Sequence, residues 1–118
     1  MAVKSYKDLI VWQKSIDLVE MIYRLTGSSF PREEMYALTN QIRRAAVSIA
    51  SNIAEGHARQ STAEFKHFLS IARGSLAEVE TQLVIACRLG FLTQEQLESI
   101  MPTHDEISKM LPALIRKL

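Results

Sequence analysis

Apolar residues recur every three or four positions along most of the chain, which is the spacing of one face of an α-helix. The first segment shows this spacing at Leu9, Trp12, Ile16, Val19 and Tyr23. Glycine and proline are scarce and lie mostly at residues 26–31, 55–61 and 89–93, where they interrupt the pattern. No segment alternates with the period of two that is typical of a β-strand. The pattern therefore predicts four helices joined by short connections.

Residues at the ends of these segments set the limits of each helix. Pro31 suits a first helical turn, and Gly56 suits the left-handed position that follows a last turn. The S-x-x-E sequence at 61–64 and the T-x-x-Q sequence at 93–96 match the capping box that begins many helices. The expected helices cover residues 6–26, 31–55, 61–89 and 93–117.

Connections of about four to six residues place successive helices side by side in opposite directions. The fold class that we predict is therefore all-α, an antiparallel up-down-up-down four-helix bundle that forms one domain over residues 1–118. Pro102 removes a backbone hydrogen bond inside the fourth helix, so we expect a kink or a break there.

The first helix carries more apolar surface than one bundle groove needs. Besides the face that contains Trp12, a second set of apolar residues lies roughly 100° away around the helix. This second set consists of Val11, Leu18, Ile22 and Leu25. We predict that it packs on another subunit of a homo-oligomer.

Asn52 and Gly74 interrupt otherwise regular helical segments. Asn52 continues the apolar rhythm that runs through Ile49, so its amide should face the bundle interior and fix the helix register. A role in ligand binding is the alternative. If the second and third helices turn near residue 58, Gly74 lies opposite Ile42, where a glycine would permit close approach of the two backbones.

The charge of the chain is nearly balanced, since 14 Lys and Arg face 13 Asp and Glu and the net charge is +1. A nucleic-acid surface would therefore require local clustering. The longest wholly apolar run, 83–87, is far shorter than the roughly 20 residues of a membrane-spanning helix. The first residues lack the apolar core of a secretory signal, and Cys87 is the single cysteine, which fits a reducing compartment. We expect a cytoplasmic protein without a membrane segment.

The residues with catalytic or metal-binding chemistry do not form a recognisable site. Glu64 and His67 have the Glu-x-x-His spacing of di-iron bundles, but such a centre needs two of these motifs and two further glutamates. His57 lies in a connection, and His104 falls on the apolar stripe of the fourth helix, where a hydrogen-bonded core-edge histidine is the simpler interpretation. No nucleophile elbow or glycine-rich phosphate loop is present in the sequence. We expect no enzyme activity, no metal and no cofactor.

A basic ridge along the second and third helices is the main candidate for binding. The candidate nucleic-acid contacts are Arg43, Arg44, Arg59, Lys66 and Arg73. A turn near residue 58 would set Arg73 level with Arg43 and Arg44, with Lys66 two turns away on the same side as Arg73. One interpretation is a low-specificity contact with RNA or DNA through its phosphates. The alternative is a protein-interaction scaffold without a nucleic-acid role, in which these arginines form ion pairs or hold one subunit to the next.

Four ordered blocks of the sequence resemble the four-helix-bundle proteins encoded in bacterial 23S rRNA intervening sequences. The blocks are "YKDLIVWQKS" (6–15), "QIRRAAVSIASNIAEG" (41–56), "FLSIARGSLAEVETQL" (68–83) and "LGFL" (89–92). The resemblance implies an up-down bundle that assembles into a ring-shaped homopentamer, in a family whose molecular function is not established. It also implies, through the related accessory variability proteins of diversity-generating retroelements, a nucleic acid and a reverse transcriptase as partners. Many relatives have proline in the place of Ala50, so the second helix here would lack their bend.

Overall fold

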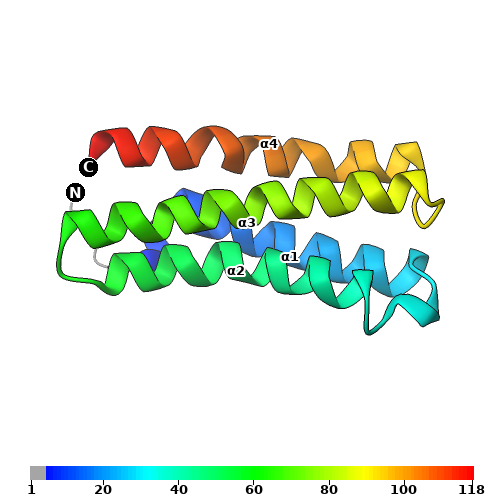
Figure 1. Ribbon diagram of the computed structural model, residues 1–118. Helices are drawn as coiled ribbons and strands as arrows, with labels where there is room; N and C mark the ends of the chain where they lie inside the picture. Colours follow the sequence, from blue (N-terminus) through cyan, green and yellow to red (C-terminus); the bar gives the residue numbers. More distant parts are fainter. Residues whose placement is uncertain (1–4) are drawn as a thin grey trace.

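The computed structural model describes residues 5–118, and these residues form four long α-helices (Figure 1). The helices are α1 (Ile10–Ser29), α2 (Leu38–Ala58), α3 (Thr62–Arg88) and α4 (Gln94–Lys117). Successive helices run in opposite directions, and each packs beside the next, with α4 returning to α1. Helices α1 and α3 therefore lie on one diagonal of the bundle. The predicted all-α four-helix bundle is confirmed, and it measures 44 × 25 × 19 Å over the described residues.

The beginnings of α1 and α2 differ from the expected limits. A separate turn of 3-10 helix, η1 (Tyr6–Asp8), precedes α1. Pro31 does not begin α2 but precedes a second 3-10 turn, η2 (Arg32–Glu34). Helix α2 begins only at Leu38, whose N–H donates to the carboxylate of Glu34 at 3.2 Å. The expected start of the second helix at residue 31 is wrong, because residues that suit a first α-helical turn also suit a short 3-10 turn.

Helices α3 and α4 each begin at a side-chain cap. The Thr93 hydroxyl accepts from the N–H of Gln96 at 3.1 Å, and the N–H of Thr93 donates to Oε1 of Gln96 at 2.8 Å. The complete capping box therefore begins α4. At α3 the Ser61 hydroxyl accepts from the N–H of Glu64 at 3.1 Å. These bonds satisfy donors that the first turn of a helix otherwise leaves unpaired.

The prediction that Gly56 ends α2 is wrong. Gly56 is buried inside the helix, and a Cβ added there would lie only 2.7 Å from Cβ of Phe68 on α3. The glycine therefore permits close approach of α2 and α3, and α2 continues to Ala58. The left-handed conformation expected at Gly56 occurs instead at Gly90, whose φ is +78° just after α3.

The register between α2 and α3 also differs from the prediction. The hydroxyls of Ser48 and Ser75 form a hydrogen bond of 2.9 Å, whereas a turn near residue 58 would set Ser48 level with residue 68. The difference is about seven residues, or about 10 Å of helix, because α2 continues past Gly56 and the turn lies further along the chain. Gly74 is consequently exposed rather than packed against α2, and a Cβ added there would meet no atom within 4 Å.

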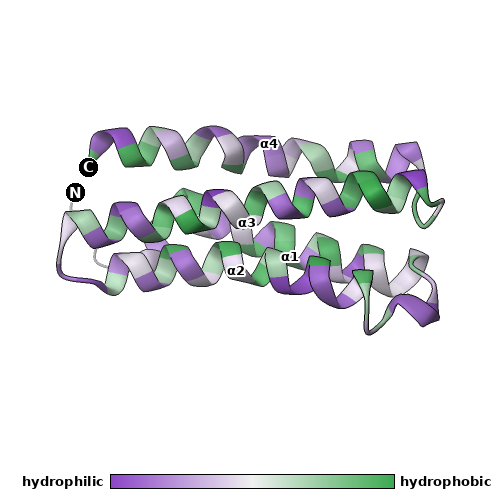
Figure 2. Ribbon diagram, in the orientation of Figure 1, coloured by the Kyte–Doolittle hydropathy of each residue, from purple (hydrophilic) through white to green (hydrophobic). Residues whose placement is uncertain are grey.

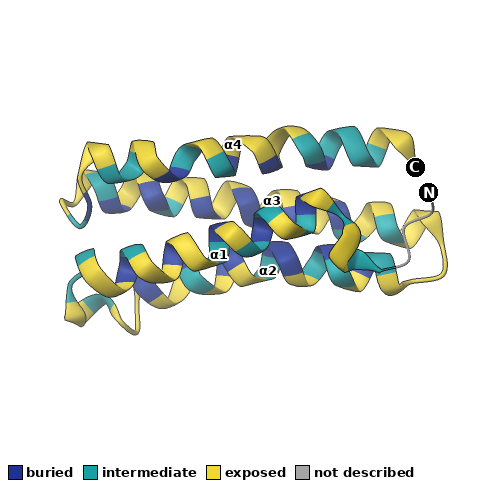
Figure 3. Ribbon diagram, turned by 180° about the vertical axis from the view of Figure 1, so that it is seen from behind, coloured by how far each residue is buried: buried dark blue, intermediate teal, exposed yellow. Residues whose placement is uncertain are grey.

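The core consists of aliphatic side chains from the facing sides of the four helices, whereas the outer sides are polar and exposed (Figures 2 and 3). It includes Val11, Leu18 and Ile22 of α1, none of them more than 4% exposed. Leu25 is half-buried against the same core. The prediction that this face contacts another subunit is therefore wrong for Val11, Leu18 and Ile22, which are buried inside their own chain, and Leu25 is packed against the same core.

Of the kink or break expected at Pro102, the break does not occur, because α4 is continuous there. A single helical segment contains both Pro102 and Pro112. Pro102 has no N–H, so the carbonyl group of Glu98, four residues earlier, has no helical hydrogen-bond donor. Both residues are exposed, so this carbonyl group can bond to water.

Candidate functional site

Arg43 connects α2 to α1. Its Nε donates to the hydroxyl of Thr26 at 2.8 Å, and its guanidinium carbon lies 4.5 Å from the centre of the Tyr23 ring. The negative face of an aromatic ring attracts a guanidinium in this position. Arg43 is therefore half-buried and held at the seam between α1 and α2.

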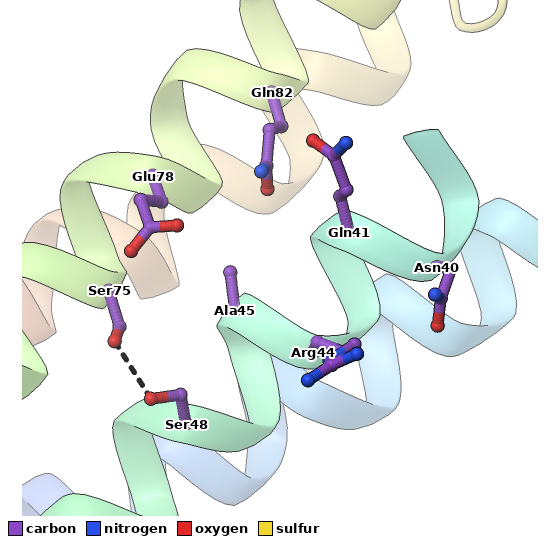
Figure 4. Close-up of a pocket in the computed structure, with 8 residues that line it drawn as sticks. All are labelled: Asn40, Gln41, Arg44, Ala45, Ser48, Ser75, Glu78 and Gln82. Carbon is purple, nitrogen blue, oxygen red and sulfur yellow. Dashed lines mark hydrogen bonds between the residues drawn. The ribbon is translucent and has the colours of Figure 1, made fainter. Parts of the chain in front are cut away.

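Arg44 lies about 100° further around α2 than Arg43. Its side chain is exposed and lines a cleft of about 400 Å³ between α2 and α3 (Figure 4). Arg44 forms no ion pair with any residue of the range 5–118. The two adjacent arginines thus belong to different seams of the bundle. Neither forms an ion pair within residues 5–118, and only Arg43 is held there by a hydroxyl group and an aromatic ring.

The other basic candidates are distributed along the bundle. Arg59 pairs with Glu55 at 3.0 Å, and its guanidinium carbon lies 5.1 Å from the centre of the Phe68 ring. Lys66 and Arg73 are both exposed on α3. Lys66 and Arg73 are seven residues apart, which puts them on the same side of α3, two turns from each other.

The five basic candidates therefore do not form one ridge. Arg43 lies at the seam of α1 and α2, Arg44 lines the cleft of α2 and α3, and Arg73 lines a groove between α3 and α4. The change in register moves Arg73 about 10 Å along α3 from the level expected. The prediction of a single basic ridge is wrong for this reason.

A pair of hydroxyl groups ties α2 to α3 at the floor of the cleft, and an amide of α2 bonds one of them. Besides the bond between Ser48 and Ser75 (Figure 4), the amide of Asn52 donates to the carbonyl and the hydroxyl of Ser48, at 2.8 and 2.9 Å. Asn52 is half-buried, whereas its neighbour Ile53 is 0% exposed and occupies the interior position. Asn52 therefore supports the edge of the seam rather than the centre of the bundle, where we had predicted it.

Other polar groups of the cleft lack partners in the described chain. Glu78 lies on the α3 wall, Arg44 lies on the α2 wall, and their side chains do not point toward each other (Figure 4). Oε1 of Gln82 is buried and accepts no hydrogen bond from residues 5–118. A buried acceptor without a partner costs about 1–3 kcal/mol. The cleft thus presents a cation and an anion to any molecule that enters it, and a buried acceptor lies in its lining.

An apolar groove of about 280 Å³ lies on the other side of α2, at the seam with α1. It is lined by Tyr6, Trp12, Ile16, Val19, Val47, Ala50, Ser51 and Ala54. Val47 at its rim is 39% exposed, and Tyr23, one turn beyond Val19, is 45% exposed. The α1 face in this groove is the one that we expected in the core. The two faces of the first helix are therefore exchanged relative to the prediction, and the excess apolar surface of α1 lies on the Trp12 side.

His104 is a buried, hydrogen-bonded residue of the core edge. It is 3% exposed; Nε2 lies 3.2 Å from the carbonyl oxygen of Leu76 on α3, and Nδ1 lies 3.3 Å from Oδ1 of Asp105. Both ring nitrogens therefore face acceptors, and the bond to Leu76 ties α4 to α3.

The residues considered as metal ligands, Glu64 and His67, are exposed near the start of α3. Over residues 5–118 no three His, Cys, Asp or Glu side chains are grouped in a way that could hold a metal ion. In the same range, none of the helices combines the length and the apolar character that crossing a membrane requires.

The fold defines a class of protein, the antiparallel four-helix bundle. Helix α2 has an apolar groove on the side that faces α1 and a polar cleft on the side that faces α3. Residues 7–113 match the family described as 23S rRNA-intervening sequence protein, and the chain belongs to this family. It is also similar to a protein of unknown function from the S23 ribosomal protein family of Bacteroides thetaiotaomicron VPI-5482. The two are 33% identical with a TM-score of 0.82, over 90% of this chain and 98% of that one. No curated protein matches the chain. The resemblance found in the sequence is therefore confirmed.

Proposed function

We propose that this protein is a non-enzymatic scaffold that works as a homo-oligomer, and that the apolar groove between α1 and α2 forms the contact between subunits. The observation that carries the proposal is the partly exposed apolar lining of that groove, with Trp12, Ile16 and Val19 on one wall and Val47 on the other. Contiguous apolar surface of this kind is typical of interaction sites. Its burial stabilises a contact by roughly 25 cal/mol per Å². A ring of five subunits is the form that the family resemblance suggests.

Analytical ultracentrifugation of the protein at micromolar concentration tests this proposal. Val47→Glu puts a charge at the rim of the groove and should convert the oligomer to a monomer, because a carboxylate is costly to bury without a partner. Val84→Glu is the matched control, since Val84 is 40% exposed on α3, away from the groove, against 39% for Val47. The control should still assemble. A wild-type protein that remains monomeric, or equal behaviour of the two variants, would defeat the proposal.

A second candidate function is low-specificity binding of RNA or DNA, which the placement of Lys66 and Arg73 favours. Both residues are exposed on the same side of α3, and neither forms an ion pair within residues 5–118. Repetition of this pair on every subunit of an oligomer would add weak phosphate contacts into a stronger multivalent one.

A salt titration with a generic RNA tests this second function. Release of counterions predicts that the binding constant falls steeply as the salt concentration rises. Lys66→Glu with Arg73→Glu should abolish binding while the oligomer persists. Arg24→Glu with Arg32→Glu makes the same change of charge on α1 and η2, away from this side of α3, and should have little effect. An RNA-binding constant that is unchanged by Lys66→Glu with Arg73→Glu would count against a role for these residues.

A further inference from the structure

Gly74 has no function within its own chain that the structure shows. It lies in the interior of α3, is exposed, and has a negative φ, and a Cβ added there would meet no atom within 4 Å. Glycine inside a helix is about 1 kcal/mol less favourable than alanine. The missing side chain leaves a shallow depression on the outside of α3, where another helix could approach closely.

Three other residues share that side of α3. At 100° per residue, Ile71, Gly74, Glu78 and Ile85 fall within an arc of about 60°. We call these four residues the α3 outer face. Ile71 and Ile85 are 39% and 42% exposed. Glu78 is exposed and forms no ion pair with a residue of the range 5–118. The face therefore combines apolar side chains, a depression and an unpaired carboxylate.

The groove between α1 and α2 has complementary features in a matching order. Arg43 lies at one end of the groove, where Tyr23 and Thr26 fix its guanidinium and only Nε has a hydrogen-bond acceptor within the described residues. Val47, one turn further along α2, protrudes at the rim, and the small Ala50 lies three residues beyond it.

The spacing along the two helices is the same. Glu78, Gly74 and Ile71 follow one another on α3 at steps of four and three residues. Arg43, Val47 and Ala50 follow one another on α2 at the same steps, in the opposite direction of the chain. Antiparallel contact would therefore bring a carboxylate to a guanidinium, a protruding side chain to a depression, and a large aliphatic side chain to a small one.

We propose that the α3 outer face of one copy of this chain docks into the α1–α2 groove of a second copy, with Glu78 paired to Arg43. This inference rests on the proposed homo-oligomer and names both sides of its contact. The two surfaces lie on different helices and differ in shape and charge, so the contact is heterologous. Such a contact leaves one free surface at each end of a dimer and leads to a closed ring or a filament.

Mixing two variants tests the heterologous contact. Gly74→Gln fills the depression. Because a Cβ at this position meets no atom within 4 Å, the variant should fold with unchanged helix content and yet remain monomeric. Val47→Glu disrupts the groove but leaves the α3 outer face intact. Either variant alone should be a monomer, and an equimolar mixture should form a dimer of one copy of each, because one intact pair of surfaces remains. Native mass spectrometry distinguishes the mixed dimer by its mass.

Two results would overturn this inference while leaving the proposed oligomer in place. One is a Gly74→Gln protein that assembles like the wild type, and the other is a mixture of the two variants that forms no dimer. A monomeric wild type would instead defeat the proposed function itself.

The charge pair has its own test. Glu78→Gln should weaken self-association about ten- to a hundredfold, as expected for the loss of a hydrogen bond between charged groups. Glu80→Gln makes the same change two residues away, on the side of α3 that lines the groove with α4, and should leave the association constant unchanged. Equal effects of the two substitutions would show that Glu78 does not form the proposed pair.

Discussion

A methyl group at Gly56 would collide with atoms that have little room to move. It would lie 2.7 Å from Cβ of Phe68 and 3.3 Å from the backbone oxygen of Phe65. Gly56→Ala should therefore lower the free energy of unfolding by about 1–3 kcal/mol, the usual cost of overpacking. Gly27→Ala is the control, since its Cβ would have only an ordinary contact of 3.8 Å with the end of Arg43. Urea denaturation that found the two variants equally stable would contradict the close approach.

Replacement of Arg43 should destabilise the fold more than replacement of the adjacent Arg44. Arg43→Ala removes a hydrogen bond to Thr26 and the contact with Tyr23, so it should lower the free energy of unfolding by about 1–3 kcal/mol. Arg44→Ala should change it by less than about 0.5 kcal/mol, as is usual for an exposed residue without partners. Both are best measured by urea denaturation in a Val47→Glu background, so that assembly makes no contribution. Equal losses would show that Arg44 also supports the fold.

Two hydroxyl residues explain why the sequence predicts the wrong buried face for α1. Ser15 and Thr26 lie on the buried face and are polar residue types, whereas the neighbouring face, about 100° around the helix, carries bulky Trp12. In the structure each hydroxyl donates to a carbonyl of its own helix, Ser15 to Val11 at 2.7 Å and Thr26 to Ile22 at 2.8 Å. A serine or threonine bonded in this way can be buried without an unsatisfied group. Its presence is therefore a weak sign of an exposed face.

At the scale of the element, local signals located the starts of α3 and α4 better than that of α2. The cap residues Ser61 and Thr93 act on donors within three residues of themselves. The start of α2 depends instead on how residues 35–37 turn between η2 and Leu38. Ala37 makes no side-chain cap bond, and the carboxylate that the N–H of Leu38 bonds belongs to Glu34, four residues earlier. The sequence therefore contains no standard cap motif from which the start could be inferred.

Pro102 gives a prediction for α4. A proline inside a helix removes one backbone hydrogen bond and is about 3 kcal/mol less favourable than alanine. Because Pro102 is exposed in a continuous helix, Pro102→Ala should raise the free energy of unfolding by up to about 3 kcal/mol. Thermal denaturation followed by circular dichroism measures this gain. An unchanged or lower melting temperature would mean that the packing of α4 depends on the proline.

At the scale of the whole molecule, assembly should be visible in thermal stability. A folded state that is stabilised by association melts at a higher temperature when the protein concentration rises. The melting temperature of the wild type should therefore increase between about 1 and 100 μM, while that of Val47→Glu should stay constant. Differential scanning fluorimetry across this range is sufficient. A wild-type melting temperature that does not depend on concentration would contradict a folded state stabilised by assembly.

The sequence by itself determined the features that depend on neighbours within three or four residues. These include the all-α class, four helical segments, the caps of α3 and α4, and the family resemblance carried by four sequence blocks. Only the tertiary structure decided the register of α2 against α3, the buried face of α1, and the separate seams of Arg43 and Arg44. Each of these depends on residues that are far apart in the chain. A shift of a few residues at one turn changes which side chains meet, and it leaves the helical periodicity of the sequence unchanged.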